Sequence, residues 1–524
     1  MATDIQIKMQ RVIARNPATG EALREFECAS ATEVNAAVGR ARAAQPAWAE
    51  LGVRARVETL RQFQRLLYQN KDEVARTITR EHGKPQVEAL LTEVLVVLDT
   101  ARFLIDNAHA MLKPEPVPHG NLIMKAKSAY LLREPYGVIG IISPWNYPFS
   151  TPATETLAAL VAGNAVVIKP SEFTPLATLE LARLLYEAGL PTDVFQVVIG
   201  DGSTGGALVE APVDKIVFTG SVRTGKRVAE AAAKKLLPVL LELGGKDPML
   251  VLDDADLEVA TTAALWGAFM NAGQTCLSVE RCYVHRSLYE KFLAAVVEKT
   301  RKLRVGNGMN PETEIGPIIH EQQLRIVETH VADAIARGAR LLYGGRRLPE
   351  LGPTFYAPTV LADVTHDMLI MREETFGLVL PVMSFATDDE AVRLANDSEF
   401  GLAASIWTSD RRRGEAMAPR IQAGTVMVND VISCYGISEA PHGGVKSSGL
   451  GRAHGRLGLE EMVCVKYVDS DLLPRMRKVW WYGYGENFAR QMEGFVDFLF
   501  ARSWTRRVRG GLRSFRAYFR AGRL

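Results

Sequence analysis

Short runs of continuous apolar residues alternate with helical stretches through the middle of this chain. Val138–Ile142 and Ala165–Lys169 are two such runs, and residues 196–200 and 215–220 continue the series. Strands that are apolar at every position are buried on both faces, which is typical of a parallel sheet covered by helices on both sides. A second series begins near residue 248 with Pro-Met-Leu-Val-Leu. The pattern predicts an α/β fold.

The chain before this region has the spacing of helices. Alanine, valine and leucine recur at helical intervals through residues 55–69 and 86–111, which predicts helices across residues 32–113. With 524 residues the chain is too long for one compact core, so we expect two or more domains. Its 47% hydrophobic and 23% charged residues are ordinary for a globular protein.

The cysteines indicate a reducing compartment. There are five of them, an odd number, and they are scattered along the chain, which argues against a disulfide framework. Neither they nor the nine histidines have the spacing of metal ligands, so we expect no metal. The start of the chain has no apolar signal segment, and no run approaches the roughly 20 apolar residues of a membrane span. We therefore expect a cytoplasmic protein.

A glutamate and a cysteine, each among small residues, are the strongest chemical signal. Glu242 stands in Leu-Glu-Leu-Gly-Gly-Lys-Asp (241–247), and Cys276 ends Phe-Met-Asn-Ala-Gly-Gln-Thr-Cys (269–276). A carboxylate can act as a base and a thiol as a nucleophile, which indicates covalent catalysis. The alternative is that the cysteine is a small buried hydrophobe, the commoner role for a single cysteine.

Three further segments have the composition of ligand-binding loops. Residues 218–226 follow a predicted strand and open a helix, where Gly220 and Gly225 allow backbone amides to approach a phosphate. Lys169-Pro-Ser-Glu172 ends another strand, where an acid can hold ribose hydroxyls. Asn146, on a loop between two prolines, can donate to an oxyanion. A tight turn, a surface ion pair and an Asx turn are the respective structural alternatives.

Together these segments resemble the NAD(P)-dependent aldehyde dehydrogenase superfamily, from about residue 12 to residue 468. The matching motifs occur in the family's order along the chain: Asn16-Pro-Ala-Thr-Gly-Glu, Pro144-Trp-Asn-Tyr-Pro, Gly163-Asn-Ala-Val-Val-Ile-Lys-Pro-Ser-Glu, Phe218-Thr-Gly-Ser, Leu241-Glu-Leu-Gly-Gly-Lys, Gly273-Gln-Thr-Cys, Glu373-Glu-Thr-Phe-Gly and Pro441-His-Gly-Gly-Val-Lys-Ser-Ser-Gly-Leu-Gly-Arg. Any one of these motifs can arise by chance, but the ordered set cannot.

The resemblance implies a role for each matched residue. Cys276 attacks the aldehyde, Asn146 and the backbone amide of Cys276 hold the oxyanion, and Glu242 activates the water that hydrolyses the thioester. The implied cofactor-binding residues are Lys169 and Glu172 at the adenosine ribose, Trp145, Gly220, Ser221 and Gly225 near the phosphates, and Glu374 and Phe376 at the nicotinamide ribose. Glu172 favours NAD because it would repel a 2′-phosphate, and NADP remains open.

The resemblance also implies an architecture. We expect two Rossmann-like α/β domains and a small β oligomerisation arm, in a homodimer or a homotetramer. The expected segments are an NAD-binding domain (1–122 and 137–243), a catalytic domain (244–432), the arm (123–136 and 433–470) and a C-terminal tail (471–524).

The substrate is less constrained than the reaction. Tyr147, Met270 and His442 are expected to line the substrate tunnel, and His442 stands where the family usually has phenylalanine. No paired arginines indicate a carboxylated substrate, which favours a hydrophobic, medium- or long-chain aldehyde. The alternatives are a semialdehyde dehydrogenase for a small metabolite such as succinate semialdehyde, and a catalytically inactive binding relative.

Residues 471–524 form a basic, aromatic tail beyond most of the resemblance. They carry twelve lysines and arginines, four acids and twelve aromatic residues, for a net charge of +8, whereas the rest of the chain has −6. Arginine and aromatic side chains together are typical of a segment at a membrane surface, here the inner face of a membrane. Packing on the enzyme itself or on a dimer partner is equally open. We expect no nucleic-acid partner, because the body of the chain is acidic.

Overall fold

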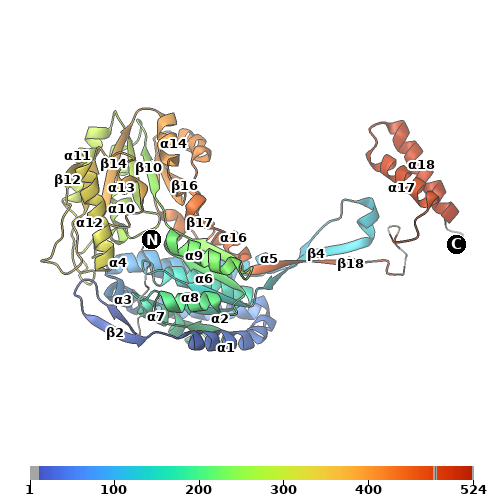
Figure 1. Ribbon diagram of the computed structural model, residues 1–524, viewed down its shortest axis with the longest axis horizontal. Helices are drawn as coiled ribbons and strands as arrows, with labels where there is room; N and C mark the ends of the chain where they lie inside the picture. The colour runs from blue at the N-terminus through green and yellow to red at the C-terminus, as the bar shows by residue number, and fades with distance from the viewer. Residues whose placement is uncertain (1–10, 476–477, 479–480, 522–524) are drawn as a thin grey trace. The chain divides into compact units, whose positions relative to one another are not determined.

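The computed structural model describes residues 11–475, 478 and 481–521, in two compact units. The larger unit is Met1–Glu115 with Leu131–Lys466, and the smaller unit is Pro116–Tyr130 with Tyr467–Leu524. The larger unit contains two predominantly parallel sheets with helices between the strands (Figure 1). The predicted α/β class is therefore confirmed.

A six-stranded sheet forms the core of the first half of the larger unit. Its order is β17-β9-β8-β5-β6-β7, and all neighbours are parallel except β17 with β9. The strands are β5 (Val138–Ile142), β6 (Ala165–Lys169), β7 (Phe195–Val197), β8 (Lys215–Thr219), β9 (Val239–Glu242) and β17 (Gly449–Leu450). Because Thr219 is paired with Glu242, the carboxyl ends of β8 and β9 meet at one edge, where ligands collect in such sheets.

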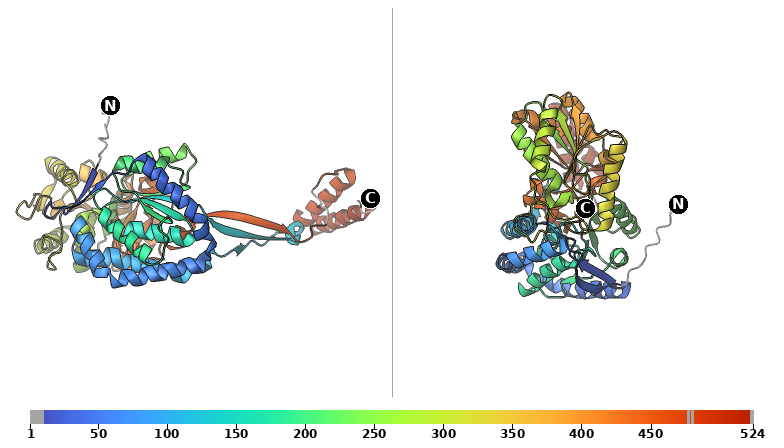
Figure 2. Two further views of the ribbon diagram at one scale, coloured as in Figure 1. Left: turned by 90° about the horizontal axis from the view of Figure 1, so that it is seen from below. Right: turned by 90° about the vertical axis from the view of Figure 1, so that its left-hand side faces the viewer.

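Helices cover this sheet on both faces. The N-terminal helices, drawn in blue, lie along its outside in Figure 2. They confirm the prediction of helices across residues 32–113: α1 (Ala31–Glu50), α2 (Gly52–Gln69), α3 (Lys71–His82), α4 (Gln86–Ala89), the π-helical turn η1 (Leu90–Val94) and α5 (Leu95–Leu112). The helices between the strands are α6 (Ser150–Ala162), α7 (Pro175–Glu187), α8 (Gly202–Glu210) and α9 (Val222–Ala233).

A seven-stranded sheet forms the second half. Its order is β12-β13-β14-β11-β10-β15-β16, parallel except for β12 with β13. The strands are β10 (Asp247–Val251), β11 (Val279–His285), β12 (Arg340–Tyr343), β13 (Thr359–Ala362), β14 (Val379–Phe385), β15 (Ala403–Trp407) and β16 (Thr425–Val428). In Figure 1, β14 and β10 lie between α12 (Glu321–Ala336) on one side and α14 (Asp388–Asn396) on the other.

The remaining elements of the larger unit are short helices and one hairpin. The helices are α10 (Leu257–Phe269), α11 (Tyr289–Thr300), α13 (Leu369–Arg372), α15 (Arg411–Met417) and α16 (Gly455–Glu460), with the 3-10 turns η3 (Met270–Gly273), η4 (Ala418–Arg420), η5 (Ser433–Gly436) and η6 (Lys446–Ser448). The hairpin of β1 (Arg11–Arg15) and β2 (Ala22–Glu27) did not follow from the sequence pattern. Assignment of the two halves to cofactor binding and catalysis stays a prediction.

The third sheet has the order β18-β4-β3, and its strands are β3 (Glu115–Pro116), β4 (Lys127–Pro135) and β18 (Val463–Asp471). The smaller unit holds part of each of these strands, the 3-10 turn η2 (Leu122–Ala126) and two helices, α17 (Glu486–Phe500) and α18 (Trp504–Ala521). These helices pack closely because glycines face one another: a Cβ on Gly494 would lie 2.7 Å from the carbonyl oxygen of Gly510. Among the described residues, no helix is both long and apolar enough to cross a bilayer.

Candidate active site

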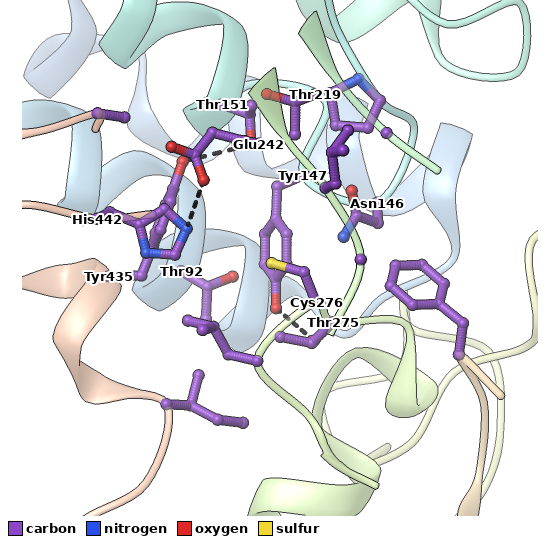
Figure 3. Close-up of a pocket in the computed structure, with 18 of the residues that line it drawn as sticks. Thr92, Asn146, Tyr147, Thr151, Thr219, Glu242, Thr275, Cys276, Tyr435 and His442 are labelled. Carbon is purple, nitrogen blue, oxygen red and sulfur yellow. Dashed lines mark hydrogen bonds and ion pairs between the residues drawn. The ribbon is translucent and has the colours of Figure 1, made fainter. Parts of the chain in front are cut away.

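One large cavity in the larger unit brings the predicted catalytic residues together. It has a volume of about 1020 Å³, and Cys276, Glu242 and Asn146 all line it. Figure 3 shows them on separate segments of the chain, around the ring of Tyr147. The sequence order 146, 242, 276 thus becomes one site, because the loops after β5, β9 and α10 open onto the same space.

The loop that carries Cys276 is held in an unusual backbone conformation. Asn271 and Ala272 both have φ of 56°, a left-handed region that costs non-glycine residues energy. The Asn271 side chain offsets this cost, because its Nδ2 donates to the carbonyl oxygens of Asn146 (3.0 Å) and Gln274 (3.1 Å). These bonds fix the approach to Cys276.

Asn146 is anchored to the same loop. Its Nδ2 donates to the carbonyl oxygen of Gln274 at 3.1 Å, and the Tyr147 hydroxyl lies 2.7 Å from Oγ1 of Thr275. An amide nitrogen has two hydrogens, so the second hydrogen of Asn146 is available to an oxyanion next to Cys276. The geometry therefore suits the predicted role of Asn146.

A buried ion pair behind Asn146 was not found by sequence reasoning. Lys84 Nζ donates to Glu93 Oε1 at 2.7 Å and to the Asn146 carbonyl oxygen at 2.9 Å, and both side chains of the pair are fully buried. Glu93 Oε2 also accepts from the backbone amides of Phe149 and Ser150. The pair holds the loop of Asn146 from behind, and no motif in the sequence links these distant residues.

Glu242 ends β9 inside the cavity and is only 5% exposed. Neither of its carboxylate oxygens makes a hydrogen bond to another described residue. Burial raises the pKa of Glu242 well above its usual value, and the nearby carboxylate of Glu155 raises it further. A Cβ on Gly443, which has φ of 146°, would lie 2.9 Å from Glu242 Oε1, so glycine gives this carboxylate its room. A raised pKa suits a group that must take up a proton during turnover.

Two buried histidines lie beside Glu242. His442 Nε2 is 3.7 Å from Glu242 Oε2, and the rings of His442 and His454 are 5.9 Å apart. Both ring nitrogens of His454 are buried without a hydrogen bond to another described residue. Its backbone has φ of 58° and ψ of 164°, a region populated almost only by glycine and costing about 1–3 kcal/mol. Position 442 was predicted as a tunnel residue, but His454 was not singled out.

The surroundings of Cys276 favour its neutral thiol form over the thiolate. Burial raises its pKa well above the usual value, and the charges of Asp247, Glu374 and Glu242 raise it further. Ionisation of this thiol therefore needs a base or a nearby positive charge.

The cofactor end of the cavity holds most of the predicted contacts. Trp145, Gly220, Ser221, Glu374 and Phe376 line it, and the Trp145 and Phe376 rings are 5.3 Å apart. Ser221 begins α9, so the cavity reaches the positive end of a helix, which suits a pyrophosphate. Glu374 Oε1 accepts from the Gly245 amide at 3.0 Å, and burial raises its pKa to about 8.

Three other predicted cofactor residues lie outside the lining of this cavity. Lys169 and Glu172 pair at 3.2 Å just after β6. Gly225 is inside α9, where a Cβ would lie 2.4 Å from the Leu243 side chain, so this glycine also serves close packing. Their contacts with a cofactor stay predictions.

The opposite end of the cavity is mainly apolar. The predicted tunnel residues Tyr147, Met270 and His442 line it. With them are apolar side chains from several elements: Leu91, Leu95, Val96, Trp266, Ile432 and Ile437. Leu91 (49% exposed), Leu95 (53%) and Ile437 (48%) reach solvent and therefore mark the mouth.

The comparisons with known proteins agree with this site. The family model described as "Aldehyde dehydrogenase family" matches residues 6–468. The chain is 40% identical over 522 residues to a 4,4'-diapolycopene aldehyde oxidase of Methylomonas sp, which covers 97% of this chain and 96% of that protein. It is also 40% identical over 460 residues to a putative succinate-semialdehyde dehydrogenase [NADP(+)] of Mycolicibacterium smegmatis, covering 88% and 87%.

Solved structures give the same result. The NAD+ complex of an aldehyde dehydrogenase from Bacillus cereus is 36% identical, with a TM-score of 0.84, and the match covers 88% of this chain and 93% of that one. An NADP-dependent enzyme of E. coli has the same identity and TM-score, with 88% and 95% covered. The chain belongs to the aldehyde dehydrogenase family, whose members oxidise aldehydes with NAD(P).

Proposed function

We propose that this enzyme oxidises a hydrophobic, medium- or long-chain aldehyde to its carboxylic acid, with Cys276 as nucleophile and Glu242 as base. The apolar end of the cavity carries this proposal. Of the described residues that line the cavity, the cationic ones are Arg223 and Arg372, which accompany the cofactor-end residues Ser221 and Glu374. Asp99 lines the substrate end and disfavours a second carboxylate. The name of the Methylomonas relative points in the same direction.

The proposed reaction has two halves. In the first, Cys276 loses its proton to solvent, its Sγ adds to the aldehyde carbon, and Asn146 Nδ2 with the Cys276 amide holds the oxyanion. When bound, NAD(P) accepts the hydride, which leaves an acyl thioester on Cys276. In the second, Glu242 removes a proton from water, the water oxygen forms a bond to the carbonyl carbon, and the carbon–sulfur bond breaks. Glu242 then gives this proton to the departing sulfur, which regenerates the Cys276 thiol and releases the carboxylic acid.

An aldehyde panel tests the substrate class. Purified protein with NAD is assayed by NADH absorbance against succinate semialdehyde, hexanal and decanal. Each buried methylene contributes about 0.8 kcal/mol, so we expect kcat/KM to rise by roughly two- to fourfold per CH2. A preference for succinate semialdehyde would instead favour the semialdehyde function that the Mycolicibacterium relative's name suggests. The same assay with NADP tests whether Glu172 favours NAD.

We further propose that the smaller unit binds anionic membrane surfaces. Exposed apolar side chains recur at intervals of four residues along α17 and α18: Val496 (57% exposed), Phe500 (75%), Trp504 (76%), Val508 (39%) and Leu512 (53%). Arginines at 506, 507, 509, 513 and 516 accompany them on α18, and no acid follows Asp497. Apolar and cationic side chains on one helical hairpin suit a lipid interface with negative headgroups. A match to 97% of the chain also extends into this region in the Methylomonas relative.

Liposome flotation tests the membrane proposal. The full chain is expected to float with vesicles containing phosphatidylglycerol and to stay unbound with phosphatidylcholine alone or at high salt. Replacing Phe500 and Trp504 by glutamate is expected to abolish binding. A control, Lys302→Glu, alters an exposed charge of the larger unit and is expected to leave binding unchanged. Binding that survives the Phe500 and Trp504 changes would support self-packing of the hairpin instead.

We also propose a homodimer or a homotetramer. Strand β18 is at the edge of its sheet, and Val465 (60% exposed) and Tyr467 (51%) are accessible on it. An open edge strand with apolar side chains is a template for pairing with another copy. Light scattering of the full chain tests this, and Val465→Pro is expected to reduce the mass toward that of one chain.

A further inference from the structure

The polar groups around Glu242 include a histidine that the reaction described above does not use. His442 Nε2 and Glu242 Oε2 are 3.7 Å apart, and both residues are about 5% exposed. The backbone fixes this approach, because His442 and Ala453 exchange two hydrogen bonds of 2.8 Å, N to O in both directions. A small rotation of the Glu242 side chain brings the two groups into hydrogen-bonding distance, as is common when an active site fills.

We propose that His442, supported by His454, is a positioning residue that donates a hydrogen bond from Nε2–H to the carboxylate of Glu242 and so keeps this base ionised for hydrolysis of the thioester. The inference rests on the proposed role of Glu242. It does not depend on which aldehyde the enzyme prefers.

The surroundings explain why Glu242 needs such a donor. Burial, Glu155 on α6 and Glu461 just after α16 disfavour its ionised form, whereas Arg452 and the nearby backbone amide of Ala453 favour it. Arg452 is itself engaged, since its Nη1 donates to the carbonyl oxygens of Gly444 and Gly451. A hydrogen bond to the charged form favours that form, so a donor at 442 opposes the effect of burial.

His442 is suited to donate as a neutral ring. Burial, with His454 and Arg452 nearby, lowers its pKa to about 3, so the ring carries one N–H at neutral pH. A neutral donor stabilises the Glu242 carboxylate without competing for its proton. Figure 3 shows the ring of His442 turned toward Glu242, next to the ring of Tyr435.

His454 contributes from the other side. It lines both the main cavity and a second cavity of about 20 Å³, which it shares with Glu155 and Ser438 and which has room for one water. Its backbone is strained, and its two buried ring nitrogens have no hydrogen bond to another described residue. Both features lower the stability of the folded state. A side chain retained at such a position indicates a role other than stability.

The test separates the two halves of the reaction. Stopped-flow mixing of holoenzyme with propanal measures the NADH burst, which reports acylation, and the following steady state, which reports thioester hydrolysis. For His442→Phe we expect an unchanged burst and a steady-state kcat at pH 7 lowered about tenfold or more. The acid limb of the kcat–pH profile is expected to move to higher pH, because Glu242 then ionises less readily.

Matched variants make the result specific. His442→Gln keeps an N–H donor and is expected to return the acid limb to near the wild-type position. His454→Gly suits the backbone φ of 58° and is expected to shift the limb in the same direction as His442→Phe, by less. If His442→Phe does not fold, His454→Gly tests the proposal in its place. His366→Phe, a histidine that bonds Tyr283 and Asp397, is expected to leave the profile unchanged.

Three outcomes would overturn the proposal in distinguishable ways. If Glu242→Gln retains steady-state turnover, Glu242 is not the base and the inference fails with it. If Glu242→Gln blocks hydrolysis while His442→Phe leaves the acid limb in place, only the role of His442 is refuted. An acid limb that moves equally in His442→Gln and His442→Phe would show that packing, not hydrogen bonding, matters at this position.

Discussion

Cys276 and Glu242 line the same cavity, but their surroundings are built in opposite ways. We call the surroundings of Cys276 the paired end and those of Glu242 the unpaired end. Around Cys276, the side-chain amide nitrogens are hydrogen-bonded: those of Asn146 and Asn271 hold the nucleophile loop, and the Lys84–Glu93 ion pair holds Asn146. Around Glu242, several buried polar atoms have no hydrogen bond to another described residue: Oε2 of Glu155, both carboxylate oxygens of Glu242 and both ring nitrogens of His454. The first end fixes a geometry, whereas the second keeps groups free to change protonation. Fixed donors suit an oxyanion, and unpaired acids suit proton transfer.

The largest expected effect on the paired end comes from removing the positive charge of Lys84, which lies behind Asn146. Lys84→Met leaves Glu93 buried without its charge partner, which costs about 3–5 kcal/mol in the free energy of unfolding. We expect a large fall in Tm by calorimetry together with a slower NADH burst. Lys71→Met, at an exposed lysine 3.5 Å from Asp72, is the control and is expected to change stability by less than about 1 kcal/mol. Equal effects of the two changes would contradict the role of the buried pair.

Removing the oxyanion donor tests the paired end directly. Asn146→Ala is expected to lower kcat by about 10²- to 10³-fold, and the NADH burst should slow as much as the steady state because both halves pass through an oxyanion. Stopped-flow fluorescence measures both rates. Asn107→Ala, which removes an amide that bonds the Phe103 carbonyl outside the cavity, is expected to leave both rates unchanged.

At the unpaired end, ionisation of buried Glu155 is expected to lower the free energy of unfolding as the pH rises. Burial raises the pKa of Glu155 to about 8, above its value in the unfolded chain, so the folded state binds the extra proton and loses stability between about pH 4.5 and pH 8. Glu155→Gln removes this titration. Its Tm, relative to wild type, should rise from pH 5 to pH 8 by the equivalent of at least about 1 kcal/mol. A difference that is constant with pH would show that Glu155 titrates normally.

The smallest expected effect on stability comes from the Tyr147 hydroxyl, which also belongs to the paired end. Tyr147→Phe removes the 2.7 Å contact with Oγ1 of Thr275 and is expected to cost about 0.5–1.5 kcal/mol in stability, because the loop keeps its other bonds. The NADH burst is expected to slow less than in Asn146→Ala. A larger loss than in Lys84→Met would mean that the tyrosine, not the ion pair, holds the loop.

Sequence reasoning found the residues that sit in local patterns. The continuous apolar runs at 138–142, 165–169 and 215–219 became parallel strands, and the motifs around Cys276, Glu242 and Asn146 proved to line one cavity. Local composition carries such signals, because a buried strand or a glycine-rich loop needs particular residues at adjacent positions.

The supporting residues are invisible in the sequence because their partners are distant along it. Lys84 contacts Asn146, which lies 62 residues further along the chain, and the sequence gap between Glu242 and His442 is longer still. Lys84 lies between α3 and α4 and Glu93 lies in η1, and charged residues in such segments are ordinarily solvated, so nothing local indicates complete burial. The strain at His454 likewise depends on the bridge between His442 and Ala453, which only the folded chain contains.

The number of residues in the π-helical turn Leu90–Val94 determines which side chains of the following helix face the cavity mouth. A π turn holds one residue more than an α turn, and here it precedes Leu95, Val96 and Asp99 on the cavity wall. Deleting a single residue from it would restore regular α-helix and rotate everything after it by about 100° relative to the preceding helix. The wall of the mouth would then be formed by a different set of side chains. Substrate range in this enzyme is therefore open to change by insertion or deletion of one residue, without any substitution at the mouth itself.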